Sequence, residues 1–107
     1  MSRFAEVFER LAAVIESRRG ADPASSWSAK LIADPKLAAK KLAEEAVETA
    51  LAAGQNDAEA VAAESADLIY HWLALLASQG VSLDAVAAKL EAREGTSGIA
   101  EKAGRKP

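Results

Sequence analysis

The sequence has no cysteine and a single histidine, and its only aromatic residues are two tryptophans, two phenylalanines and one tyrosine. The absence of cysteine excludes disulfides and thiolate metal sites, and it fits a reducing cytoplasm. With one histidine and no nucleophile elbow, neither a zinc site nor serine–histidine catalysis is expected. Alanine dominates the apolar residues instead, which favours closely packed helices over a β-sandwich.

Long hydrophobic runs are also missing. The longest, residues 68–77, is interrupted by His71 and falls short of the roughly 18 residues that a membrane span needs. The N-terminus begins as an amphipathic helix with acidic residues, so we expect no signal peptide. There is no glycine-rich phosphate loop, and a net charge of −3 argues against binding to nucleic acid. We therefore expect a soluble, cytoplasmic protein without membrane or nucleic-acid partners.

Apolar residues recur at helical spacing along most of the chain, and no segment alternates as a strand does. We expect one all-α domain over residues 1–107, with a polar tail over residues 96–107. Short loops between helices predict an antiparallel bundle of four main helices. The first expected helix starts after Ser2 and ends before Gly20, and a short helical piece follows at 27–33. The second and third expected helices cover 35–53 and 57–79, and the fourth runs from Ser82 to residues 93–95.

Acidic residues gather in the second expected helix. Glu44, Glu45 and Glu48 fall within an arc of about 100° on one side of that helix. The simplest interpretation is a solvated face, in which Lys40 and Lys41 pair with the glutamates four residues further on. The like-charge pair Glu44–Glu48 costs about as much as those pairs contribute, so this cluster alone does not decide between a site and a solvated face.

The third expected helix is more informative. Glu64, Asp67 and His71 form one narrow stripe on a helix that is apolar on nearly every other side, which is typical of a buried helix. Carboxylates removed from water need a cation, and two facing acidic stripes would repel each other without one. Mg²⁺ prefers oxygen ligands, so we expect it between the i, i+3 pairs Glu45–Glu48 and Glu64–Asp67. The alternative is a thin solvent-facing edge. We interpret His71 as a packing residue, although it could instead orient a carboxylate.

The pattern Glu44-Glu45-x-x-Glu48 followed by Glu64-x-x-Asp67 resembles the acidic signature of the all-α nucleoside-triphosphate pyrophosphohydrolases (MazG-like). Flanking segments are similar to the phosphoribosyl-ATP pyrophosphatase family, and the likeness runs from about residue 4 to residue 106. The similar segments are residues 26–31, 40–41, 66–71 and 93–102.

This resemblance implies a homodimer that uses Mg²⁺ to hydrolyse the α–β phosphoanhydride of phosphoribosyl-ATP, the second step of histidine biosynthesis. The implied metal ligands are Glu45, Glu48, Glu64 and Asp67. The general base is implied to be Glu44 or Glu45, and the resemblance leaves that choice open. The implied substrate-binding and phosphate-binding residues are Lys30, Lys41, Arg93, Thr96, Ser97 and Gly98.

Two other functions stay open from the sequence. A house-cleaning pyrophosphohydrolase that acts on canonical or damaged nucleoside triphosphates would carry the same acidic motif. A non-enzymatic helical dimerisation module would tolerate loss of charge at Glu64 and Asp67. Only the segment from Arg93 onward favours phosphoribosyl-ATP among these alternatives.

Overall fold

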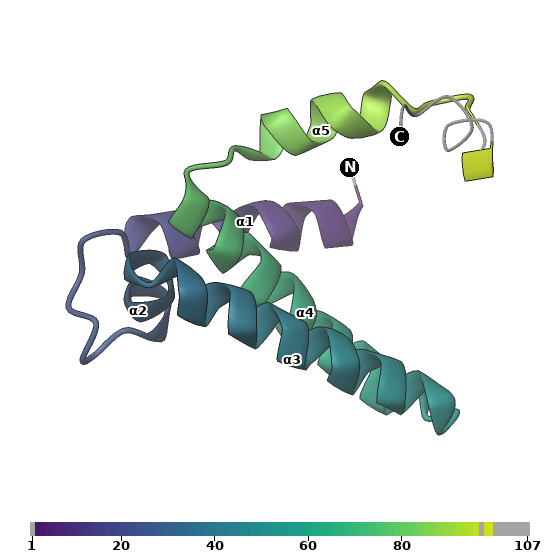
Figure 1. The fold of residues 1–107 in the computed structure, drawn as a ribbon, viewed down its shortest axis with the longest axis horizontal. Helices are drawn as coiled ribbons and strands as arrows, with labels where there is room; N and C mark the ends of the chain where they lie inside the picture. Colours follow the sequence, from purple (N-terminus) through teal and green to yellow (C-terminus); the bar gives the residue numbers. More distant parts are fainter. Residues whose placement is uncertain (1, 97, 100–107) are drawn as a thin grey trace.

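The computed structural model describes residues 2–96 and 98–99, and within them helices are the only regular secondary structure (Figure 1). This confirms the predicted all-α class, including the short helical piece before the long acidic helix. Every described helix begins within one residue of its expected start. The helices are α1 (Arg3–Ser17), α2 (Trp27–Ala33), α3 (Pro35–Gly54), α4 (Ala58–Gln79) and α5 (Leu83–Glu91).

Each helix begins after a residue whose side chain accepts a hydrogen bond from a backbone N–H in the first turn. These N-caps are Ser2, Ser26, Asp34, Asp57 and Ser82, with N···O distances of 3.0–3.1 Å. Such a cap contributes about 1 kcal/mol by pairing a donor that the helix cannot satisfy itself. At the other end of α4, Gly80 adopts a left-handed conformation (φ 67°), which turns the chain towards α5.

The α3–α4 hairpin is the most extensively packed part of the molecule, and Figure 1 shows the two helices side by side. The connection is short, so the helices run antiparallel. Helices α1 and α2 pack on α4 near its C-terminal end. Small side chains allow this close approach, because Ala38 of α3 and Ala74 of α4 are both fully buried in one cluster with Leu31.

Helix α5 departs from the predicted four-helix bundle. None of its residues is buried, and Figure 1 shows it lying apart from the α3–α4 hairpin. It also ends at Glu91, two to four residues earlier than expected, and turns follow up to Gly95. The Cα radius of gyration is 16.0 Å, whereas a compact chain of this length has about 13 Å. The bundle within one chain is therefore built from α1 to α4.

Helix α4 is less covered than its apolar composition predicts. Only His71, Leu73 and Ala74 are buried, and neighbours such as Leu68 and Leu76 are half-buried. Within the described residues no single helix is long and apolar enough to cross a membrane. Helices α4 and α5 reach that length and composition only as a pair, and the pair is bent by 107°.

Candidate metal centre

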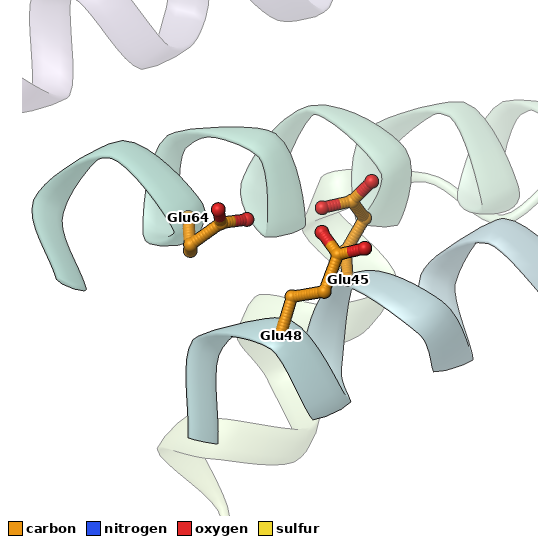
Figure 2. A group of neighbouring side chains, drawn as sticks. All are labelled: Glu45, Glu48 and Glu64. Carbon is orange, nitrogen blue, oxygen red and sulfur yellow. The ribbon is translucent and has the colours of Figure 1, made fainter. Parts of the chain in front are cut away.

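Three glutamates from the α3–α4 hairpin converge on one point. Glu45 and Glu48 of α3 and Glu64 of α4 each offer a carboxylate oxygen, and these oxygens lie within 4.8 Å of one another. Figure 2 shows the three carboxylates directed into the space between the two helices. The spacing i, i+3 places the first two on one side of α3, and antiparallel packing brings α4 opposite. The prediction that the two acidic stripes face each other is thus confirmed for these three residues.

Two of these carboxylates are withdrawn from water. Glu45 is only 8% exposed and Glu64 is half-buried, whereas Glu48 is exposed. Within the described part of the chain, Glu45 Oε2 and Glu64 Oε2 are buried oxygens that accept no hydrogen bond. A buried acceptor without a partner costs free energy, and a charged one costs more. These two oxygens are therefore suited to a ligand that the protein itself does not supply.

The electrostatics agree with this geometry. Burial is the main cause that raises the pKa of Glu45, and the neighbouring carboxylates of Glu48 and Asp67 raise it further. The pKa of Glu64 is raised by the same causes in the same order. A cation between the carboxylates would favour their charged forms and so reverse these shifts.

The donor set fits a hard divalent cation. All three ligands are carboxylate oxygens, which suit Mg²⁺ better than soft metals. At the Mg–O distance of about 2.1 Å, ligand oxygens lie about 3 to 4 Å apart. The three glutamate oxygens, which lie within 4.8 Å of one another, are close to this spacing. The exposed side at Glu48 leaves room for water and substrate.

Asp67 does not join this group of three. Its side chain is exposed, although its charge reaches Glu45 and Glu64 and raises the pKa of both. Asp67 follows Glu64 at the same i, i+3 spacing that separates Glu45 from Glu48, so helix spacing alone does not explain why it lies outside the group. Its role as a fourth metal ligand stays a prediction.

Glu44 lies outside the group of three and is held by a lysine. Lys41 Nζ is 2.8 Å from Glu44 Oε2, and this hydrogen bond is the main cause that lowers the pKa of Glu44. The lysine pairs across three residues with Glu44 rather than across four with Glu45, as the sequence had led us to expect. Burial of Glu45 towards α4 explains the change, because it turns that carboxylate away from Lys41.

The predicted phosphate-binding residues lie in separate places. Lys30 is an exposed residue of α2. Beyond α5, the Thr96 N–H donates to the Arg93 carbonyl oxygen at 3.0 Å, in a turn that contains Gly95 with φ 77°. Figure 1 shows the end of α5 apart from the α3–α4 hairpin, so one chain does not bring this turn to the three glutamates. Gly98 is exposed, and Ser97 lies outside the described residues.

A contact that the sequence did not predict joins α2 to α4. Trp27 Nε1 donates to His71 Nε2 at 3.2 Å, and His71 Nδ1 lies 2.8 Å from the Asp67 backbone carbonyl oxygen. Beside it, the hydroxyls of Ser28 and Tyr70 are hydrogen-bonded. The two partners in each side-chain pair are more than 40 residues apart, and helical periodicity carries no signal for such a pairing.

The fold and the site define a class: an all-helical protein with a carboxylate centre suited to a hard cation. Residues 8–94 match the family Phosphoribosyl-ATP pyrophosphohydrolase. The chain is 69% identical over 103 residues to the phosphoribosyl-ATP pyrophosphatase of Caulobacter vibrioides (strain NA1000 / CB15N), covering 96% of both chains. It is 67% identical over 105 residues to that of Caulobacter sp. (strain K31), covering 98% of both. It is 58% identical over 100 residues to that of Cereibacter sphaeroides (strain ATCC 17029 / ATH 2.4.9), covering 92% of this chain and 97% of the relative.

The chain therefore belongs to the phosphoribosyl-ATP pyrophosphohydrolase family.

Proposed function

We propose that this chain hydrolyses the α–β phosphoanhydride of phosphoribosyl-ATP to phosphoribosyl-AMP and pyrophosphate, as a cytoplasmic enzyme of histidine biosynthesis. Family membership and identity over nearly the whole length of named pyrophosphatases support the activity. The observation that carries the chemistry is the group of three glutamates, with two buried oxygens that lack partners among the described residues.

Glu45, Glu48 and Glu64 hold Mg²⁺ in this proposal, and Asp67 completes the set from the solvent side. When bound, the ion supplies positive charge that offsets the charge of the phosphates as the anhydride breaks. The carboxylates would hold the ion between two packed helices, whose hairpin sets their positions before substrate binds. The exposed side of the centre, at Glu48, receives the triphosphate.

Glu44 is the better of the two candidate bases. It lies beside the group of three, and the Lys41 ammonium lowers its pKa and so keeps its carboxylate ionised. Water attacks phosphorus, its proton passes to Glu44, and the bridging P–O bond breaks to release pyrophosphate. Glu45 serves less well as the base because its lone pairs are needed for the cation.

Lys30 and Lys41 bind the phosphates in this proposal, and the segment with Arg93, Thr96, Ser97 and Gly98 binds the rest of the substrate. Lys41 exchanges Glu44 for a phosphate oxygen when substrate arrives, which releases the carboxylate for the proton transfer. Charge-assisted hydrogen bonds of this kind are about twice as strong as neutral ones.

The working molecule in this proposal is a homodimer. Among the described residues, one chain leaves large apolar side chains exposed, including Phe4 at 63% and Leu90 at 60% exposure. Obligate dimers typically bury such apolar surface in their interfaces.

A pyrophosphate-release assay tests the proposal. The enzyme is offered phosphoribosyl-ATP, ATP and several deoxynucleoside triphosphates, with Mg²⁺ or with EDTA. We expect Mg²⁺-dependent release with a clear preference for phosphoribosyl-ATP in kcat/KM. A preference for deoxynucleotides would support the house-cleaning function instead, and no release from any nucleotide would support the dimerisation module.

A further inference from the structure

The only histidine of the chain bridges two helices beside the acidic centre. His71 is 8% exposed, and its two ring nitrogens each face one polar partner. Nε2 faces the indole N–H of Trp27 at 3.2 Å, and Nδ1 faces the Asp67 carbonyl oxygen at 2.8 Å. The rings of Trp27 and Tyr70 also meet the imidazole edge-to-face, with centroids 6.3 and 5.0 Å away.

These partners define the tautomer of His71. An indole N–H can only donate, so Nε2 must carry the lone pair that accepts it. A backbone carbonyl can only accept, so Nδ1 must carry the proton. Both contacts are therefore satisfied together by the neutral imidazole protonated on Nδ1, which links α2 to the backbone of α4 at Asp67.

The link lies between the acidic centre and a lysine. On one side, His71 Nδ1 is bonded to the backbone of Asp67, the residue whose charge reaches Glu45 and Glu64. On the other side, Lys30 Nζ lies over the Trp27 ring, 5.8 Å from its centroid. A cation over an aromatic face is attracted to it, so the orientation of Trp27 restricts where the ammonium can lie.

We propose that Trp27 and His71 are positioning residues, which fix α2 against the acidic centre so that Lys30 meets the phosphates of the substrate. This inference rests on the proposed function, because it assumes that a phosphorylated substrate binds beside the three glutamates. Trp27 orients Lys30 through its ring and is itself held by His71. Neither side chain takes part in the bond-breaking step.

Steady-state kinetics of His71 variants test this positioning. His71→Leu removes the acceptor, and we expect the KM for phosphoribosyl-ATP to rise about tenfold, the effect of about one lost hydrogen bond. The kcat should change by less than about threefold, because Lys30 binds ground state and transition state alike. His71→Gln offers a carbonyl oxygen near the place of Nε2, so its KM should return to within about threefold of wild type.

Trp27 variants and a matched control complete the kinetic test. Trp27→Phe keeps a ring but loses the donor and should match His71→Leu, and the double variant should be no worse than either alone. In a Lys30→Ala background, which itself has a raised KM, His71→Leu should have no further effect. Trp72→Phe removes the other indole, which packs on Phe8 of α1, and should leave KM unchanged.

A spectroscopic readout is independent of activity. Because the chain has one histidine, the ¹⁵N resonances of its imidazole are assigned without ambiguity. We expect a protonated Nδ1 and an unprotonated Nε2, with a Trp27 indole N–H that exchanges slowly in the wild type and fast in His71→Leu. The dispersion of the backbone amide resonances of the same ¹⁵N-labelled proteins shows whether each variant is folded.

The outcomes separate the two proposals. If wild type turns over phosphoribosyl-ATP and Lys30→Ala raises KM, but His71→Leu and Trp27→Phe do not, the positioning inference is overturned and the proposed function stands. A protonated Nε2 would overturn it as well. If wild type releases no pyrophosphate from phosphoribosyl-ATP, the proposed function fails, and the role of Lys30 towards its phosphates fails with it.

Discussion

Glu45 and Glu64 lie where a charged carboxylate without a partner is energetically unfavourable. Their pKa values are raised by burial and by the nearby carboxylates of Glu48 and Asp67. Each also has one buried oxygen that accepts no hydrogen bond from the described residues. The same features that penalise these residues in the metal-free protein favour a bound cation. Stability and metal binding at this centre are therefore opposed, and both can be measured.

The pH dependence of stability follows from these shifts. A carboxyl group whose pKa is raised by folding stabilises the fold at pH values below its unfolded pKa, near 4.5, and this stability is lost as pH rises through the folded pKa. We expect the metal-free wild type to lose free energy of unfolding relative to the double variant Glu45→Gln/Glu64→Gln as the pH rises above about 4.5. Urea unfolding in EDTA across this range measures the difference. A difference that does not change with pH would show that these carboxyls are not perturbed.

Replacing one proposed metal ligand should abolish stabilisation by Mg²⁺ without lowering the stability of the metal-free protein. Glu64→Gln removes a repelled charge, so we expect its Tm without metal to equal or exceed that of wild type. Millimolar Mg²⁺ should raise the Tm of wild type, because a ligand that binds only the folded state stabilises it, and should not raise that of the variant. Differential scanning calorimetry measures both, with Glu9→Gln on α1 as the matched control. An equal Mg²⁺-induced shift in all three proteins would remove Glu64 from the site.

At the scale of helices, the α3–α4 hairpin brings the acidic residues of the sequence pattern together in space. The caps Ser2 and Ser82 and the i, i+3 acids are local features that were predicted from the sequence, whereas the caps Ser26, Asp34 and Asp57 were not. The pairing of Glu64 with Glu45 and Glu48 followed from one further assumption, that a short connection makes neighbours antiparallel. Asp67 and Lys41 were less well predicted. Helical spacing does not fix whether the second acid of an i, i+3 pair turns into the site, or whether a lysine pairs with Glu44 or with Glu45, because both depend on packing.

Loss of a helix N-cap should lower the free energy of unfolding without lowering the catalytic rate. Asp57→Ala removes the acceptor for the Ala60 N–H at the start of α4, and we expect it to cost about 1 kcal/mol in the free energy of unfolding. Glu64 lies two turns further along, so kcat well below Tm should stay within about twofold of wild type. Urea unfolding and a turnover assay on the same preparation check this. A folded variant with strongly reduced kcat would mean that the helix start is part of the site.

At the scale of the whole molecule, the single chain leaves too much apolar surface exposed. Helix α5 has no buried residue, and α4 is only partly covered by α1 to α3. The sequence predicted that these helices are apolar on one side or more, but not which surface covers them, since periodicity does not distinguish an intrachain from an interchain contact. For the same reason it could not reveal the link from Trp27 to His71.

A charge on α5 should weaken the proposed dimer. Leu90→Glu places a carboxylate on the apolar side of the helix at a residue that is 60% exposed in one chain. A carboxylate buried in an interface without a partner is costly, so we expect the dimer dissociation constant to rise by 100-fold or more, on the order of 3 kcal/mol. Ala88→Glu, about 160° around the helix, is the matched control and should have little effect. Sedimentation equilibrium measures both, and an unchanged constant for Leu90→Glu would place the interface elsewhere.

In the proposed function, Glu45, Glu48 and Glu64 hold the ion needed to hydrolyse phosphoribosyl-ATP. The most direct test is the rate of pyrophosphate release from phosphoribosyl-ATP by wild type and Glu48→Gln, measured as Mg²⁺ is titrated from zero. We predict a saturable dependence on Mg²⁺ for wild type, and a rate on the order of 100-fold lower or less for the folded variant at every Mg²⁺ concentration. Equal rates for the two proteins, or full activity in EDTA, would contradict the claim.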